Sequence, residues 1–245
     1  MRGCFRSRTL AIAITLVLVG CSTTTKTQPC NPGASMLNAT LWIQSSAEYR
    51  AVALQTYALA RRALDAALAE PAALPPAIML DLDETALDNT RYAARSIRKN
   101  KMFLFDDDWT RWVAESAADA VPGAAEFLVY AKSRGVTPFY ITNRGTDMEA
   151  ATRANLQKLG FPVDEDTLLV RRDTYDKTSR RDFVAASHRV LLLFGDDLND
   201  FTGASGKSVT ERQAIADAAA QEWGTRWFVL PNPMYGSWSV PPCLD

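Results

Sequence analysis

The sequence predicts an α/β domain of three layers, with a parallel sheet at its centre and a smaller helical region added to it. Short apolar runs alternate with helical stretches of about 10–15 residues, a pattern typical of parallel sheets covered by helices on both faces. Two of these runs end directly in acidic clusters. With 245 residues, 47% of them hydrophobic, the chain is long and apolar enough to form a substantial core.

The N-terminus predicts a signal peptide over residues 1–20. Three arginines in the first eight residues precede the apolar stretch Leu10 to Val19, which is about half as long as a membrane span. The stretch ends in Leu-Val-Gly before Cys21 and resembles the lipobox of bacterial lipoproteins, in which the cysteine is lipidated. The alternatives are an ordinary secretory signal or a short anchor helix. By the resemblance, Ser22 after the cysteine favours the outer membrane of a Gram-negative cell.

Residues 21–35 predict a flexible tether, because they are rich in polar residues and lack apolar periodicity. The folded domain is expected over residues 36–245. Apart from Cys4 in the signal and Cys21, the chain has only Cys30 and Cys243. An even pair in an oxidising compartment favours a disulfide, and two free thiols on the chain ends are the alternative.

Helical additions to the core are expected at about 36–70 and 88–120. Apolar residues recur every three or four positions from Met36 to Leu68, and prolines end this helix. The second addition predicts two helices joined by a loop. Core strands are predicted at 77–82, 136–142, 168–170, 190–194 and 226–230. Core helices are predicted at 122–134, 146–159, 179–187 and 209–222.

Two predicted strands end in acidic clusters, which are Asp81-Leu82-Asp83-Glu84-Thr85 and Gly195-Asp196-Asp197-Leu198-Asn199-Asp200. Ligand sites of open α/β sheets lie beyond the carboxyl ends of the strands. Carboxylates that converge there form an oxygen-rich site suited to Mg²⁺. The alternative is that these acids are turn residues and helix N-caps, which explains one such cluster more easily than two.

Polar residues between the clusters could complete a phosphate pocket. Thr142 and Asn143 end the second core strand, and Lys177 precedes a helix. A hydroxyl, backbone N–H groups and an ammonium are suited to a phosphate dianion. Taken alone, Lys177 is better explained as a solvated surface residue, and the binding role depends on the order in which the four segments occur.

The order of these segments resembles the haloacid-dehalogenase (HAD) superfamily of phosphohydrolases. Its four motifs match Asp81-x-Asp83, Thr142, Lys177 and Gly195-Asp196-Asp197-x-x-Asp200. The superfamily's Rossmann-like core agrees with the predicted sheet, and the helical addition would correspond to its cap.

Further segments resemble the class C acid phosphatases, the family of the lipoprotein e 5′-nucleotidases. They are Asp108-Trp109-Thr110-x-Trp112-Val113, Val121-Pro122-Gly123-Ala124, Tyr140-Ile141-Thr142-Asn143-Arg144 and Pro231-Asn232-x-x-Tyr235-Gly236-x-Trp238. The chain departs from the family in its fourth motif, because Asp197 stands where an asparagine is expected.

The resemblance implies a mechanism and a cofactor. Asp81 would attack phosphorus, and Asp83 would protonate the leaving oxygen and then activate water. Mg²⁺ would be held by Asp81, the main-chain carbonyl of Asp83 and Asp196, with Asp200 in support. Thr142, Asn143 and Lys177 would bind the phosphate oxygens. An acid at position 83 separates phosphomonoester hydrolysis from dehalogenation, in which the halide leaves without a proton.

Aromatic residues are the candidates for substrate specificity. Trp109, Trp112 and Tyr235 lie in segments near the family's pocket mouth and could stack on a nucleobase or aryl group. For the two tryptophans, core packing on one helix face is an equal alternative. Tyr235 lies in a predicted loop, which favours a binding role.

These observations predict a Mg²⁺-dependent acid phosphatase of the outer membrane, anchored by lipid on Cys21, whose substrates are small phosphomonoesters such as nucleoside 5′-monophosphates. A net charge of −1 argues against binding a nucleic-acid polymer. The alternatives are a HAD phosphatase for another small phosphomonoester and a non-catalytic surface lipoprotein. The sequence allows a homodimer and does not specify one.

Overall fold

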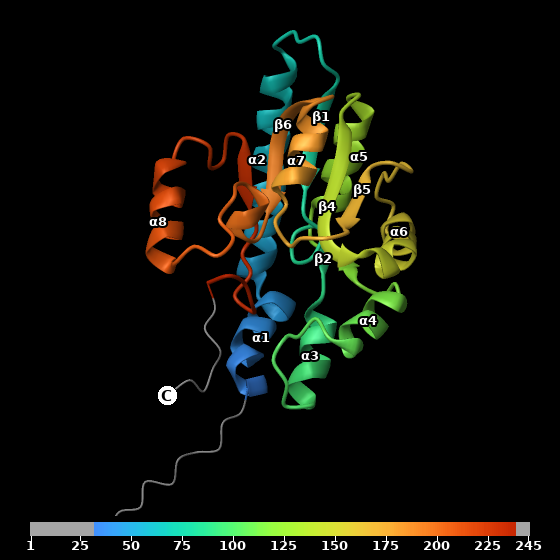
Figure 1. Cartoon of the computed structure of the whole chain (residues 1–245), viewed down its shortest axis with the longest axis vertical. Coiled ribbons are helices and arrows are strands. Elements are labelled where there is room, and N and C mark those ends of the chain that lie inside the picture. Colours follow the sequence, from blue (N-terminus) through green and yellow to red (C-terminus); the bar gives the residue numbers. More distant parts are fainter. Residues whose placement is uncertain (1–31, 239–245) are drawn as a thin grey trace, which may run out of the picture.

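The computed structural model describes residues 32–238, and its centre is a five-stranded sheet in the order β5–β4–β1–β6–β7 (Figure 1). Every pairing between neighbouring strands of this sheet is parallel. The predicted parallel α/β fold is therefore confirmed. The strands are β1 (Pro76–Leu80), β4 (Thr137–Gly145), β5 (Leu168–Arg171), β6 (Arg189–Gly195) and β7 (Trp227–Val229).

Helices cover both faces of the sheet. Successive side chains of a strand point to opposite faces, so Ile78 and Leu80 of β1 join one apolar core while Ala77 and Met79 join another. The first core packs against α2 and α5, and the second contains Val184 of α7 (Figure 1). The helices of the core are α2 (Ala47–Leu68), α5 (Ala124–Ser133), α6 (Glu149–Lys158), α7 (Thr178–Ala185) and α8 (Val209–Ala218), with short 3-10 helices at Thr146–Met148 and Leu198–Asp200.

The N-terminal helix is interrupted, although its periodicity predicted one continuous helix. A 3-10 helix (Pro32–Met36) leads into α1 (Leu37–Ser45), and α2 begins after Ser46. Ser46 has an extended backbone, and its Oγ accepts a hydrogen bond of 3.0 Å from the N–H of Tyr49. Ser46 is therefore the N-cap of α2, and its extended backbone separates α2 from α1.

The 3-10 helix overlaps the segment assigned to the tether, residues 21–35. Gly33 is buried there, and a Cβ at this position would lie 3.0 Å from the carbonyl oxygen of Ile97. The predicted signal peptide, Cys21, Cys30 and Cys243 lie outside the described residues. Within residues 32–238, none of the helices combines the length and the apolar character needed to cross a membrane.

The cap consists of two helices beyond the carboxyl ends of the strands (Figure 1). They are α3 (Thr90–Arg98) and α4 (Asp107–Ala114), as the sequence predicted. They are joined to the core by an antiparallel pair of two-residue strands, β2 (Leu87–Asp88) and β3 (Asp119–Ala120). This pair was not predicted, because two residues are too few to show alternation.

Candidate active site

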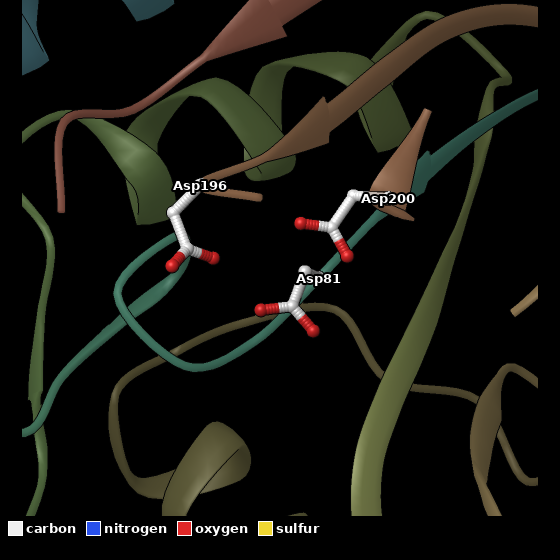
Figure 2. Close-up of side chains that lie close together, drawn as sticks. All are labelled: Asp81, Asp196 and Asp200. Carbon is white, nitrogen blue, oxygen red and sulfur yellow. The ribbon is translucent and has the colours of Figure 1, made fainter. Parts of the chain in front are cut away.

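Three carboxylates meet at the carboxyl edge of the sheet. Leu80 at the end of β1 is in register with Phe194 of β6, so the residues that follow each strand are neighbours. Asp81, Asp196 and Asp200 each contribute one carboxylate oxygen to a group in which all oxygens lie within 4.8 Å of one another. Figure 2 shows the three side chains directed toward a common space. The two acidic clusters of the sequence therefore form one site.

Gly195 is what allows Asp200 to reach this site. A Cβ at position 195 would overlap the side chain of Asp200, so only glycine fits here. Asp200 is also fixed by the backbone N–H of Asp197, which donates to its Oδ2 at 3.0 Å. Asp197 and Asp200 form a capping box on the 3-10 helix Leu198–Asp200. The N-cap interpretation of the acidic cluster is thus correct for Asp197.

Lys177 is buried beside the carboxylates and is not a surface residue. Its Nζ lies 2.6 Å from Oδ1 of Asp200 and also donates to Oδ1 of Asp81. Burial favours the neutral amine, but the two adjacent carboxylates raise the pKa of Lys177 above its ordinary value. Lys177 is therefore a fixed positive charge between the two acidic clusters.

The carboxylates have unusual acidities in the metal-free site. Burial raises the pKa of Asp81 to about 7; Lys177 opposes this shift, and Asp200 and Asp83 add to it. Burial and then the neighbouring Asp200 and Asp81 raise the pKa of Asp196 well above its ordinary value. One lysine is not enough to compensate three clustered carboxylates. A divalent cation with oxygen ligands fits this donor set.

Asp83 is held by hydrogen bonds from two residues, Arg144 and Asn89. Nη2 and Nε of Arg144 lie 2.7 and 3.1 Å from its Oδ1, and Nδ2 of Asn89 lies 2.9 Å from the same oxygen. Oδ2 receives only a longer contact of 3.3 Å from Nε of Arg144. Both Asp81 and Asp83 line one cavity of about 470 Å³, and the two acids therefore face a shared space.

The two tryptophans of α4 occupy different places. Trp109 lines the cavity, and the guanidinium of Arg144 lies 5.4 Å from the centre of its ring. Trp112 is 1% exposed and does not line the cavity; its Nε1–H donates to Oδ1 of Asn89 at 2.8 Å. For Trp112 the sequence left substrate binding and core packing as equal alternatives, and in the structure its ring is packed in the core against Asn89. Both rings are buried, at 2% exposure for Trp109 and 1% for Trp112, so the neighbours of each ring and not its depth separate the two positions.

The remaining predicted phosphate ligands also differ in position. Asn143 lines the cavity, and its Oδ1 accepts a hydrogen bond of 2.8 Å from Nη2 of Arg180. Thr142 is fully buried and is not part of the cavity lining. Its Oγ1 accepts from the backbone N–H of Arg144 at 3.1 Å. In this structure Thr142 therefore supports the strand end that carries Asn143 and Arg144.

Tyr235 lies in the cavity wall as predicted. Its ring packs on Phe103, with 4.1 Å between the ring centres, and Phe105 lies 5.5 Å away. Its hydroxyl donates a hydrogen bond to the carboxyl group of Glu84, which is buried. Burial and the adjacent Asp83 raise the pKa of Glu84 well above its ordinary value, against the hydrogen bond from Tyr235. The loop after β7 is thereby tied to the loop after β1.

Comparison with known proteins identifies the family. Residues 18–238 match the model of HAD superfamily, subfamily IIIB (acid phosphatase). The chain belongs to this family. The class C acid phosphatase from Bacillus anthracis is 39% identical, with a TM-score of 0.82 over 85% of this chain and 88% of that one. Its tungstate-bound structure gives 39% identity and a TM-score of 0.81 over 84% and 87%.

Plant relatives are more distant. A stem 28 kDa glycoprotein of Glycine max is 24% identical over 64% of this chain, and a stem 31 kDa glycoprotein is 26% identical over 63%. The chain spans only 58% and 57% of these two proteins. The HAD subfamily IIIB assignment therefore rests on the family model and the bacterial structures.

Asp197 is the position at which this HAD subfamily IIIB chain departs from the expected motif. Its Oδ1 accepts from Nη2 of Arg212 and from the N–H of Asn199, each at 2.9 Å, and its Oδ2 accepts from the N–H of Ser237 at 2.9 Å. Burial alone would raise the pKa of Asp197, but these donors lower it below its ordinary value. The added carboxylate is compensated by its own arginine and links the motif to α8 and to the loop after β7.

Three functional neighbours were not singled out from the sequence, namely Arg144, Asn89 and Glu84. Arg144 and Asn89 reach Asp83 across 61 and 6 positions of the chain. Glu84 has a left-handed backbone, with φ of 62°, which turns its side chain into the interior. A strained non-glycine residue beside two acidic candidates shows only in the structure.

Proposed function

We propose that this protein is a metal-dependent phosphatase that hydrolyses small phosphomonoesters through an aspartyl-phosphate. The observation that supports this most directly is that Asp81 and Asp83 line one cavity together with Lys177, Asp196 and Asp200. The family assignment supports phosphatase chemistry, and one relative in the family holds tungstate, a tetrahedral oxyanion like phosphate.

In the proposed first step, a carboxylate oxygen of Asp81 attacks phosphorus. A P–O bond forms to Asp81, and the P–O bond to the alcohol breaks. Lys177 lies against Asp81 and would stabilise the negative charge on the non-bridging oxygens. Asn143, on the cavity wall, would donate its amide N–H to a phosphate oxygen, because its Oδ1 is already bonded to Arg180.

Asp83 would serve as acid and then as base. Arg144 and Asn89 concentrate their donors on Oδ1, which leaves Oδ2 as the oxygen that carries the proton. That proton passes to the leaving alkoxide, and the resulting carboxylate takes a proton from the water that cleaves the aspartyl-phosphate. Inorganic phosphate is released, and Asp81 and Asp83 return to their starting protonation states.

Asp81, Asp196 and Asp200 would hold the divalent cation, and Mg²⁺ fits their hard oxygen ligands. When bound, the cation offsets the repulsion between these carboxylates and an incoming phosphate dianion. The main-chain carbonyl of Asp83 is a further ligand implied by the family resemblance.

The aromatic side of the cavity supports nucleoside 5′-monophosphates as substrates. Phe103, Phe105, Trp109 and Tyr235 give the cavity a wall of tilted and edge-on rings. A planar base gains stacking and burial on such a wall, whereas a sugar phosphate gains less. Phe105 is 56% exposed and so has a ring surface free to meet a ligand.

We also propose that the enzyme is attached to the outer membrane through lipid on Cys21. This rests on the lipobox-like sequence alone. Stable attachment requires more than one acyl chain, as in bacterial lipoproteins.

The test is hydrolysis of p-nitrophenyl phosphate with and without Mg²⁺, followed by a panel of nucleoside 5′-monophosphates and sugar phosphates. We expect Mg²⁺-dependent release of phosphate and a higher kcat/KM for nucleotides. Equal or better hydrolysis of sugar phosphates would favour a different phosphomonoester. No hydrolysis of any ester by the metal-loaded protein would favour the non-catalytic surface lipoprotein.

A further inference from the structure

Arg171 is a cation of the cavity wall whose charge is not used by the site described above. The other cations in the cavity lining are paired, Lys177 with Asp81 and Asp200 and Arg144 with Asp83. Arg171 forms no ion pair with any residue between 32 and 238. Asp147 approaches the same glycine, Gly145, as Nη2 of Arg171, yet the two side chains are not joined.

Two contacts fix the direction of the Arg171 guanidinium. Its Nε donates to the carbonyl oxygen of Asn143 at 3.1 Å, and its central carbon lies 4.3 Å from the ring centre of Tyr175. Neither contact uses the terminal amino groups, which have no hydrogen-bond partner among the described residues. A guanidinium held at Nε and by its face presents these two groups as a fork, the geometry that binds a phosphate or carboxylate in two places.

The sheet order places Arg171 away from the aromatic wall. Asp81 follows the central strand β1, Arg171 ends the edge strand β5, and Tyr235 follows the other edge strand, β7. Each edge strand is two strands from β1, a distance of about 10 Å at the usual strand spacing. The cavity thus has the reaction centre in the middle, the aromatic wall with Tyr235 toward one edge, and toward the other an unpaired cation that packs on the single ring of Tyr175.

We propose that Arg171 binds a second anionic group of the substrate, and that nucleoside 3′,5′-bisphosphates are therefore better substrates than the corresponding 5′-monophosphates. The inference rests on the proposed function. With the 5′-phosphate at Asp81 and the base on the aromatic wall, C4′ of the ribose lies near the reaction centre, and C3′ leaves it on the side opposite to the ring oxygen that leads to the base. A phosphate on C3′ faces the side of the cavity on which Arg171 lies.

The experiment compares kcat/KM for adenosine 3′,5′-bisphosphate and 5′-AMP in the Mg²⁺-loaded protein and in variants of position 171. We expect the ratio of the two values to fall about tenfold in Arg171→Gln, the effect of losing one charge-assisted contact. Arg171→Lys keeps the charge without the fork, and we expect an intermediate ratio. The ratio is the informative quantity, because loss of the bond to Asn143 would slow both substrates alike.

Arg172→Gln is the matched control, since it removes the same charge from an exposed neighbour and should leave the ratio unchanged. The product is identified as well, and we expect adenosine 3′-phosphate. Release of 5′-AMP, an unchanged ratio in Arg171→Gln, or an equal fall in Arg172→Gln would overturn the assignment. Hydrolysis of p-nitrophenyl phosphate in the same samples separates this result from failure of the proposed function.

Discussion

Nη2 of Arg144 lies 2.7 Å from Oδ1 of Asp83, and the Arg144 side chain is 1% exposed. Its Nη1 is held by Oγ1 of Thr152 at 3.1 Å, so the guanidinium is fixed from both sides. Asp83 sits in a loop between the core and the cap, and Arg144 lies near the end of β4, an inner strand of the sheet. Arg144 therefore ties Asp83, a loop residue, to the sheet and holds its carboxyl group in a defined position.

Replacing Arg144 is expected to impair leaving-group protonation more than phosphate binding. Arg144→Gln should lower kcat for 5′-AMP by about ten- to a hundredfold, within the range attributed to general acid catalysis. The effect on p-nitrophenyl phosphate should be smaller, because a phenolate leaves with less need of a proton. Steady-state kinetics on both esters measure this, and equal losses would contradict a positioning role for Arg144.

The two acids at the end of β1 are expected to fail in different ways. Asp81→Asn should abolish turnover on every ester, since an amide does not attack phosphorus. Asp83→Asn should slow alkyl phosphates far more than aryl phosphates. Circular dichroism of both variants serves as the folding control. Turnover by Asp81→Asn, or equal losses on both ester types in Asp83→Asn, would remove these residues from the proposed roles.

Metal removal is expected to make stability depend on pH. In the metal-free protein the pKa of Asp81 is raised to about 7, above its ordinary value of 3.8. The folded state then holds a proton that the unfolded state releases, so stability is present at pH 4 and is lost as the pH rises toward 7.

The measurement is thermal unfolding in EDTA at pH 5 and 7.5, with and without added Mg²⁺. We expect a lower Tm at pH 7.5 than at pH 5, by about 2–4 °C for each kcal/mol of unfolding free energy that is lost. Added Mg²⁺ should raise the Tm at pH 7.5 again. Asp81→Asn should flatten the pH dependence. A metal-free protein that is more stable at pH 7.5, or full activity after chelation, would contradict the metal assignment.

Trp112 is expected to act on Asp83 through Asn89 and not on the substrate. Trp112→Phe keeps a ring in the core but removes the donor to Oδ1 of Asn89. The buried acceptor left unpaired should cost about 1–3 kcal/mol of unfolding free energy, measured by urea denaturation. We expect kcat for 5′-AMP to fall with KM nearly unchanged. A rise in KM alone would restore the role of Trp112 as a substrate contact.

Lipid attachment is expected to depend on Cys21. Cys21→Ser should yield a form that no longer partitions into detergent and has unchanged specific activity.

Thiol titration of the unreduced, denatured mature protein tests the other two cysteines. No free thiol is expected if Cys30 and Cys243 are bridged, and two would show that they are not.

The sequence by itself determined the sheet and the reaction centre. Alternating apolar strands and helices predicted the parallel α/β fold, which is confirmed. Both acidic clusters stand directly after strands, and parallel strands end at one edge, so the convergence of Asp81, Asp196 and Asp200 followed from position alone. Local order along the chain was enough here, because the sheet topology converts it into proximity.

Tertiary structure alone decided which neighbouring side chains complete the site. Trp109 and Trp112 have the same local pattern, yet one reaches the cavity and the other lies behind Asn89. From the sequence alone Lys177 is better explained as a surface residue, whereas the structure buries it between two carboxylates. Burial and pairing depend on segments far apart in the chain, 96 positions for Lys177 and Asp81 and 151 for Tyr235 and Glu84, and no local pattern encodes such contacts.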